Sequence, residues 1–179
     1  MPQLMTKPPL ILTLSIEKEV ALFFNTLRKK HFPPSRNFID AHLTLFHSLP
    51  NENEIVVFVK DLCEQQTPFE LIIKEVVSIG KGVAYKVESS QLMHLHKMLQ
   101  QKWQPFLSLQ DRQKLWPHIT VQNKVTIEEV KHLLYELKTG FTPLTTLATG
   151  LQLWAYLNGP WALVESFIFK EVATGNYCA

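Results

Sequence analysis

The sequence contains only two cysteines, Cys63 and Cys178, in 179 residues. They form neither a disulfide framework nor the spacing of a zinc site, and both are typical of free thiols in a reducing compartment. A long hydrophobic run is also missing. The apolar stretch at 10–16 is too short to span a bilayer, and it continues into Glu17 and Glu19 without a small-residue cleavage site. We therefore expect a cytoplasmic protein with no membrane partner.

The sequence also lacks a strong net charge. A formal charge of +2 at pH 7 is too small for a protein that grips long DNA by neutralising phosphates, although a local basic cleft can still hold a nucleotide or a short RNA. By contrast, 46% hydrophobic and 19% charged residues are typical of a globular chain with one sizeable core. The middle of the chain has no linker rich in Gly, Ser or Pro, so we expect residues 1–179 to form a single domain. We also expect the protein to be a monomer.

Hydrophobic periodicity predicts a mixture of strands and helices. Apolar runs predict strands at 9–16, 41–49, 118–125, within 141–157 and at 161–169, and a strand pair at 69–80 and 82–89. Apolar spacings of three and four predict helices at 17–30, 54–66 and 91–107. A fourth helix is predicted to begin with a capping box at Thr126 and Glu129 and to end near Leu137.

One short pattern occurs twice on the predicted strands. His42-Leu43-Thr44-Leu45 and His118-Ile119-Thr120-Val121 each lie on a strand that follows one helix and precedes another. This order is typical of an internal duplication whose halves share a sheet or pack directly together. We therefore expect an α+β fold that is bilobal and duplicated, with two antiparallel-rich sheets, helices on the outside and a central cleft.

The repeated pattern indicates a chemical site because alternate residues of a strand point to the same face. His42 and Thr44 then share one face, and His118 and Thr120 repeat the arrangement. Two imidazoles that meet in a cleft can act as general base and general acid near neutral pH. The threonine hydroxyls can donate hydrogen bonds to phosphate oxygens. One such pair would be ordinary strand packing, but two copies in equivalent places favour a functional site.

The paired motifs resemble the hallmark of the 2H phosphoesterase superfamily, in particular its 2'-5' RNA ligase (LigT-like) and cyclic nucleotide phosphodiesterase branch. The resemblance implies metal-independent action, without a cofactor, on 2',3'-cyclic phosphates or 2'-5' phosphodiester bonds of nucleotides or short RNA ends. It also implies catalytic roles for His42 and His118 and phosphate-binding roles for Thr44 and Thr120. The chain departs from the family after the second motif, where a basic residue is common and this sequence has Gln122-Asn123-Lys124.

Further residues are candidates for substrate binding. By alternation Phe46 either lines the cleft or packs in the core. Lys81, between two glycines, either reaches a phosphate or is solvated. The remaining candidates are a basic rim and two aromatic side chains that can stack on a base: Arg112, Lys114, Trp154 and Tyr156.

Two alternatives compete with an enzyme of this kind. A zinc site is disfavoured because two histidines leave a tetrahedral ion short of ligands, and His94 and His96 are two residues apart on a helix and point to opposite sides. The isolated histidines, including His47, are expected to be solvated or to cap helices. The second alternative is a non-catalytic nucleotide- or RNA-end-binding module, although the loss of one motif histidine would be the simplest route to such a protein.

Overall fold

The computed structural model describes residues 7–171, so Cys178 lies outside the described part. Each predicted strand and helix is present, with boundaries that differ by a few residues. The strands are β1 (Leu10–Ile16), β2 (Leu43–Leu49), β3 (Phe69–Ser78), β4 (Val83–Glu88), β5 (His118–Gln122), β6 (Leu144–Tyr156) and β7 (Trp161–Ile168). The helices are α1 (Lys18–His31), α2 (Asn53–Gln65), α3 (Ser90–Trp103) and α4 (Ile127–Thr139). The capping box at Thr126 and Glu129 is confirmed.

The strands form one antiparallel sheet in the order β2-β1-β6-β3-β4-β5, with β7 also paired to β6. The mixed helix-and-strand fold with outer helices is therefore confirmed, but the strands join in one sheet rather than the two that we expected. The reason is the length of β6. Its first residues, 144–148, pair with β3, and residues 148–155 pair with β1. One strand thus runs through both halves of the sheet.

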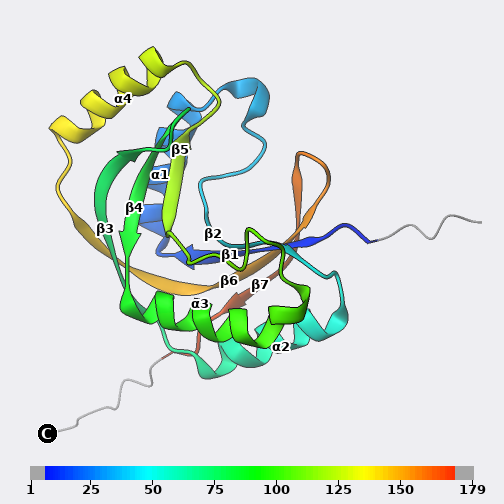
Figure 1. Cartoon of the computed structure of the whole chain (residues 1–179). Coiled ribbons are helices and arrows are strands. Elements are labelled where there is room, and N and C mark those ends of the chain that lie inside the picture. Colours follow the sequence, from blue (N-terminus) through cyan, green and yellow to red (C-terminus); the bar gives the residue numbers. More distant parts are fainter. Residues whose placement is uncertain (1–6, 172–179) are drawn as a thin grey trace, which may run out of the picture.

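The sheet curls so that its two ends approach one another (Figure 1). Irregularities in strand register accompany the curl in the β1–β2, β1–β6, β3–β4, β4–β5 and β6–β7 pairs. Such bulges bend a strand and increase its twist. The motif strands β2 and β5 are the two ends of the strand order, and the curl brings them face to face.

The helices interlock the two ends of the sheet. Helix α1, which lies between β1 and β2 in the chain, packs on the β4–β5 end, where the ring of Phe24 meets Tyr85 of β4 edge-on at 5.0 Å. Helix α3, which lies between β4 and β5 in the chain, packs on the β2 end, where His96 donates a hydrogen bond to the carbonyl of Leu45. Figure 1 shows α2 and α3 together below the sheet and α4 against the other end. Each end of the sheet therefore contacts a helix whose neighbouring strands along the chain lie at the other end.

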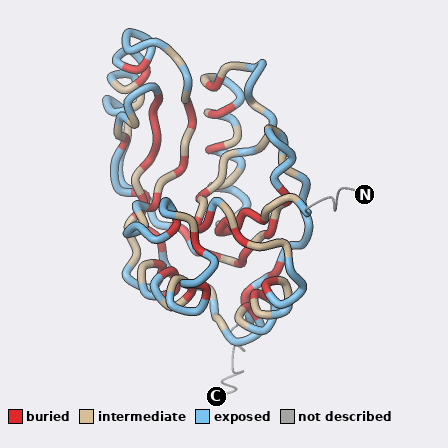
Figure 2. The backbone as a smooth tube through the Cα atoms, turned by 45° about the vertical axis from the view of Figure 1, so that its right-hand side comes forward, coloured by how far each residue is buried: buried red, intermediate tan, exposed pale blue. Residues whose placement is uncertain are grey.

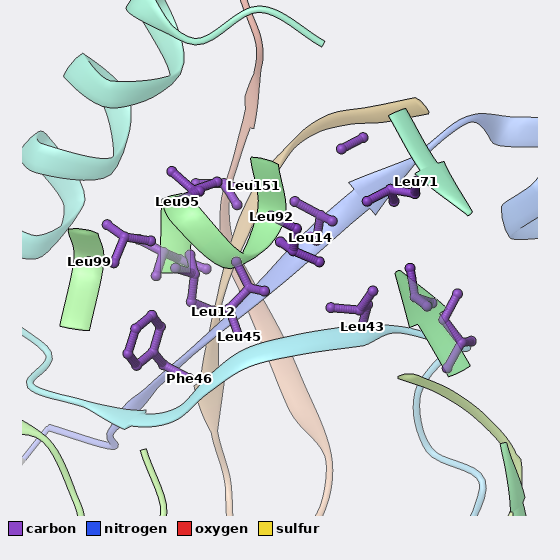
Figure 3. Packing of buried hydrophobic residues seen from close by; sticks show 14 of the residues in the cluster. Leu12, Leu14, Leu43, Leu45, Phe46, Leu71, Leu92, Leu95, Leu99 and Leu151 are labelled. Carbon is purple, nitrogen blue, oxygen red and sulfur yellow. The ribbon is translucent and has the colours of Figure 1, made fainter. Parts of the chain in front are cut away.

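The core fixes the direction in which the motif residues point. Leu43, Leu45, Ile119 and Val121 are buried, as the alternation predicts. Figure 2 shows that buried stretches follow the strands and the inward sides of the helices. Figure 3 shows the leucines of β2 among core residues of the neighbouring elements: Leu12, Leu14, Leu71, Leu92, Leu95, Leu99 and Leu151. Each buried leucine contributes about 2 kcal/mol, so turning a motif strand over would expose its apolar face at a large cost.

A search of residues 7–171 finds no helix of sufficient length and hydrophobicity to traverse a bilayer.

Candidate active site

The two motif histidines line a single pocket. His42, Thr44, His118 and Thr120 all contribute to its wall, and the pocket has a volume of about 340 Å³. The four residues come from β2 and β5 and the residue immediately before β2. The structure therefore brings together the four residues that the repeated pattern selected, although they lie at opposite ends of the strand order.

Both histidines are held by the same type of hydrogen bond. Nδ1 of His42 lies 2.7 Å from the carbonyl oxygen of Asp40, and Nδ1 of His118 lies 2.8 Å from that of Trp116. Since a carbonyl oxygen only accepts, each ring must carry a proton on Nδ1. In both rings Nε2 is consequently the nitrogen available to a substrate. It accepts a proton when the ring is neutral and donates one when the ring is charged.

Each motif histidine also packs against a tryptophan. The ring of His42 lies 4.7 Å from that of Trp161, which begins β7, and the ring of His118 lies 4.6 Å from that of Trp116. These contacts restrict the side-chain rotation that one hydrogen bond leaves free. Sequence reasoning missed both tryptophans, because neither lies within a motif and Trp161 comes from the last strand.

The surroundings favour the neutral form of both imidazoles. Burial in the cleft lowers the pKa of His42 to about 4; the hydrogen bond to the Asp40 carbonyl raises this pKa, whereas the positive charge of Arg28 lowers it further. Burial also lowers the pKa of His118, and His47 lowers it further. Both rings are thus neutral near pH 7, with a free electron pair on Nε2. A bound phosphate anion would favour the protonated form of either one.

A third histidine, His47, lines the same pocket. Alternation from Leu43 and Leu45 predicts a buried side chain at position 47, but Leu45 and Phe46 are both buried and His47 faces outward. The β1–β2 register shifts between Leu12 and Thr13, where Leu12 pairs with Phe46 and Thr13 with Thr44. This bulge turns His47 to the face of His42. The sequence contains one sign of this arrangement, because His47 is a polar residue at a position that alternation assigns to the core.

Asp111 supports His47 and is buried, with 3% of its surface exposed. Its Oδ1 accepts from the backbone N–H of His47 at 2.8 Å and lies 3.1 Å from Nδ1 of the same residue. Its Oδ2 accepts from the backbone N–H of Ser48 and the hydroxyl of Ser108. Burial raises the pKa of the Asp111 carboxyl, but these hydrogen bonds outweigh burial and hold its pKa below the ordinary value. Asp111 is therefore an ionised carboxylate.

The same bulge excludes Phe46 from the cleft. Its side chain is fully buried, stacks on His96 at 4.6 Å and meets Trp103 edge-on. Of the two interpretations of Phe46, core packing is correct and cleft lining is wrong. Simple alternation fails here because the bulge inserts one residue into β2 relative to β1.

The predicted basic residues occupy different places. Lys114 lines the histidine pocket. Arg112 does not, and its Nε instead donates to the carbonyl of Leu107. Lys81 lies in the turn between β3 and β4 and borders a separate depression with Pro33 and Lys124.

A second pocket adjoins the first. Trp154 lines it together with Ile39 and Gln152, and both His42 and Trp161 are shared by the two pockets. Nε1 of Trp154 donates to the hydroxyl of Thr13 at 2.9 Å, which fixes the plane of the indole. The other aromatic candidate, Tyr156, pairs with Trp161 in the sheet and lines neither pocket.

Within residues 7–171, no group of three or more His, Cys, Asp or Glu residues is placed to hold a metal ion.

Comparison with known proteins shows the family of this chain. The family model described as "2'-5' RNA ligase superfamily" matches residues 16–160. The chain belongs to this superfamily of 2H phosphoesterases. A search of curated proteins finds no match.

Two solved structures share the fold of this chain. The protein TT0787 of Thermus thermophilus superposes with a TM-score of 0.63 at 17% identity, over 91% of this chain and 98% of that one. E. coli LigT in its apo form superposes with a TM-score of 0.56 at 18% identity, over 92% and 99% of the two chains. The architecture is therefore similar along nearly the whole chain.

Proposed function

We propose that the protein is a metal-independent phosphodiesterase of the 2'-5' RNA ligase type. It acts on 2',3'-cyclic phosphates or on 2'-5' phosphodiester bonds of nucleotides or RNA ends. The observation that carries this proposal is the pair His42 and His118, which line one pocket and are both held through Nδ1 by a carbonyl two residues earlier. Superfamily membership supports the reaction class.

Hydrolysis of a 2',3'-cyclic phosphate needs one proton removed and one supplied. The neutral histidine accepts a proton on Nε2 from the attacking water as the new P–O bond forms. The other histidine, protonated on Nε2, gives its proton to the ribose oxygen whose bond to phosphorus breaks. The product is a nucleoside monophosphate. In ligation a ribose hydroxyl replaces the attacking water, and the two histidines keep the same roles. Cleavage of the resulting 2'-5' bond back to the cyclic phosphate uses the same two groups with their roles exchanged.

The neighbouring residues bind the rest of the substrate. The hydroxyls of Thr44 and Thr120 donate to the non-bridging phosphate oxygens, where negative charge increases in the transition state. The second pocket, with Trp154 and Trp161, receives the base by stacking. E. coli LigT, whose fold is similar, has been solved in complexes with 3'-AMP and with phosphate, which supports a nucleotide as ligand here.

The test is hydrolysis of a panel of nucleoside 2',3'-cyclic phosphates in the presence of a chelator. His42→Ala and His118→Ala are each expected to lower kcat by about 10²- to 10⁴-fold. The control is His94→Ala, because His94 is an exposed residue of α3 outside both pockets. Loss of native activity with the chelator would contradict the metal-free mechanism.

Binding of the same compounds without turnover would favour the non-catalytic binding module. In that case the two alanine variants would lose affinity, and 2'-5'-linked dinucleotides would be the next substrates to examine.

A further inference from the structure

His47 and Asp111 form a third imidazole unit within the histidine pocket. The β2 bulge directs His47 to the face that carries His42 and Thr44, and 47% of the His47 side chain is exposed. The mechanism above uses neither His47 nor Asp111. A histidine supported by a buried carboxylate is an arrangement that enzymes use to orient an imidazole and to stabilise its protonated form.

The geometry of the ring determines which nitrogen meets a ligand. Nδ1 of His47 lies 3.1 Å from Oδ1 of Asp111, so Nδ1–H donates to the carboxylate. The two ring nitrogens point in different directions, and Nε2 is left for the pocket. When the ring is protonated, Nε2–H is a charged donor. Asp111 then accepts from Nδ1–H while Nε2–H faces the bound anion.

Asp111 also keeps His47 in place through the backbone. It accepts the N–H groups of His47 and Ser48 on the outer edge of β2, which is the end strand of the sheet. The carboxylate accepts a further hydrogen bond from Ser108. The imidazole is therefore attached to the strand that carries Thr44 and follows His42, and it has a fixed direction before any substrate binds.

A phosphodiester needs positive charge in this pocket, and the two motif histidines do not supply it in the free protein. Burial favours the neutral form of both rings. The other titratable groups that line the pocket are Lys114, Asp111 and the buried His96. His96 is committed through Nε2 to the carbonyl of Leu45. His47, held through Nδ1, and Lys114 are thus the other basic side chains of the pocket placed to contact the anion.

We propose that His47, oriented by Asp111, is a phosphate-binding residue that donates from Nε2 to a non-bridging oxygen of the substrate phosphate. This inference rests on the proposed function, because it takes the anion of the cleft to be the substrate's phosphate. His47 is thus a third imidazole beside the pair that transfers protons. It contributes to the affinity for the substrate phosphate and not to proton transfer.

The decisive variant is His47→Asn. The asparagine amide reaches the position of Nδ1 and can still donate to Asp111, but it has no atom at the position of Nε2. The dissociation constants for inorganic phosphate and for nucleoside 2'- and 3'-monophosphates are expected to rise about 10- to 100-fold, as for loss of a charged hydrogen bond. KM should rise with them, while kcat at saturation changes less.

The matched control is His94→Asn, the same substitution at an exposed position of α3; it is expected to bind phosphate like the native protein. If His47→Asn does not fold, His47→Ala replaces it, because this variant also leaves no donor at the position of Nε2. In the native protein, the ring ¹⁵N resonance of His47 Nε2 is expected to shift on titration with phosphate.

The outcomes separate this inference from the proposed function. A folded His47→Asn protein that binds phosphate as tightly as the native protein overturns the inference, even if cyclic phosphates are hydrolysed. Loss of kcat with unchanged phosphate affinity also overturns it, because His47 would then act in the chemistry. Phosphate binding that depends on His47, in a protein that hydrolyses no substrate, supports the inference and contradicts the proposed enzyme.

Discussion

Arg28 of α1 donates a hydrogen bond from Nη1 to the backbone carbonyl of Thr120, 3.0 Å away in the second motif. Its Nε lies 3.0 Å from the carbonyl of Ile39 and 2.9 Å from the side-chain oxygen of Asn37, in the segment that leads to His42. One buried guanidinium therefore connects both motif segments. Burial lowers the pKa of Arg28 to about 10, although the charge of Asp40 raises it, so the side chain is charged at neutral pH.

Replacing Arg28 by lysine is expected to destabilise the protein and to misplace the motifs. A single ammonium group cannot make the divergent contacts of the guanidinium. Since a hydrogen bond to a charged group contributes about 1.5–3 kcal/mol, the free energy of unfolding should fall by about 2–4 kcal/mol in urea titrations. Arg36→Lys, at an exposed position of the 3₁₀ turn at Pro34–Arg36, is the control. Equal stability of the two variants would show that the guanidinium contacts contribute little.

The pH dependence of kcat/KM is expected to be bell-shaped, with its maximum below pH 6.5. The pKa of His42 is lowered to about 4 and that of His118 is lowered from 6.5. Since catalysis needs one ring neutral and one protonated, the active state is most populated between their pKa values. The profile of kcat should lie at higher pH, because the bound phosphate favours protonation. A kcat/KM maximum above pH 7 in steady-state assays would contradict this assignment.

Stability should also depend on pH through His42. The pKa of His42 is about 4 in the folded protein, compared with the ordinary histidine value of 6.5 that applies to the unfolded chain. At a pH between these two values, the unfolded chain therefore binds more protons than the folded protein. The contribution of the neutral His42 to the free energy of unfolding is fully present above pH 6.5 and decreases as the pH falls towards 4. Thermal unfolding of His42→Gln from pH 7.5 to 4.5 should show a shallower decrease in Tm than the native protein. Parallel curves would exclude His42 as the group responsible.

Trp161→Leu is expected to weaken nucleotide binding without affecting inorganic phosphate. Stacking of a base on an aromatic ring contributes about 1–3 kcal/mol, so KM for nucleoside cyclic phosphates should rise by about 5- to 150-fold. Tyr156→Leu, on the neighbouring strand but outside both pockets, is the matched control. A similar KM increase in both variants would point to a disturbed β6–β7 pair rather than to lost stacking.

The sequence predicted features that depend on local patterns. Periodicity gave the helices and strands, and alternation gave the direction of His42, Thr44, His118 and Thr120. The single curled sheet was not predictable in this way, because the pairing of β6 with both β1 and β3 depends on residues far apart in the chain. Alternation also failed at Phe46, where the bulge exchanges the expected roles of Phe46 and its neighbour His47.

The partners of the site were the least predictable part. Asp111 lies 64 positions after His47, in a loop between α3 and β5 whose course no periodicity specifies. Trp161 meets His42 only because β7 returns along β6. A motif identifies the reacting groups through residue types at short spacing. The side chains that orient them come from distant segments and become visible only when the fold is known.

The length of strand β6 limits how the cleft can change over evolution. Because this 13-residue strand is hydrogen-bonded to both β1 and β3, moving β2 away from β5 would bend it or break its ladders. The separation of the motif strands is therefore a property of the backbone. New substrate preferences are expected to arise from replacements at the rim, at positions such as Lys114, while the spacing of the two motif histidines is retained.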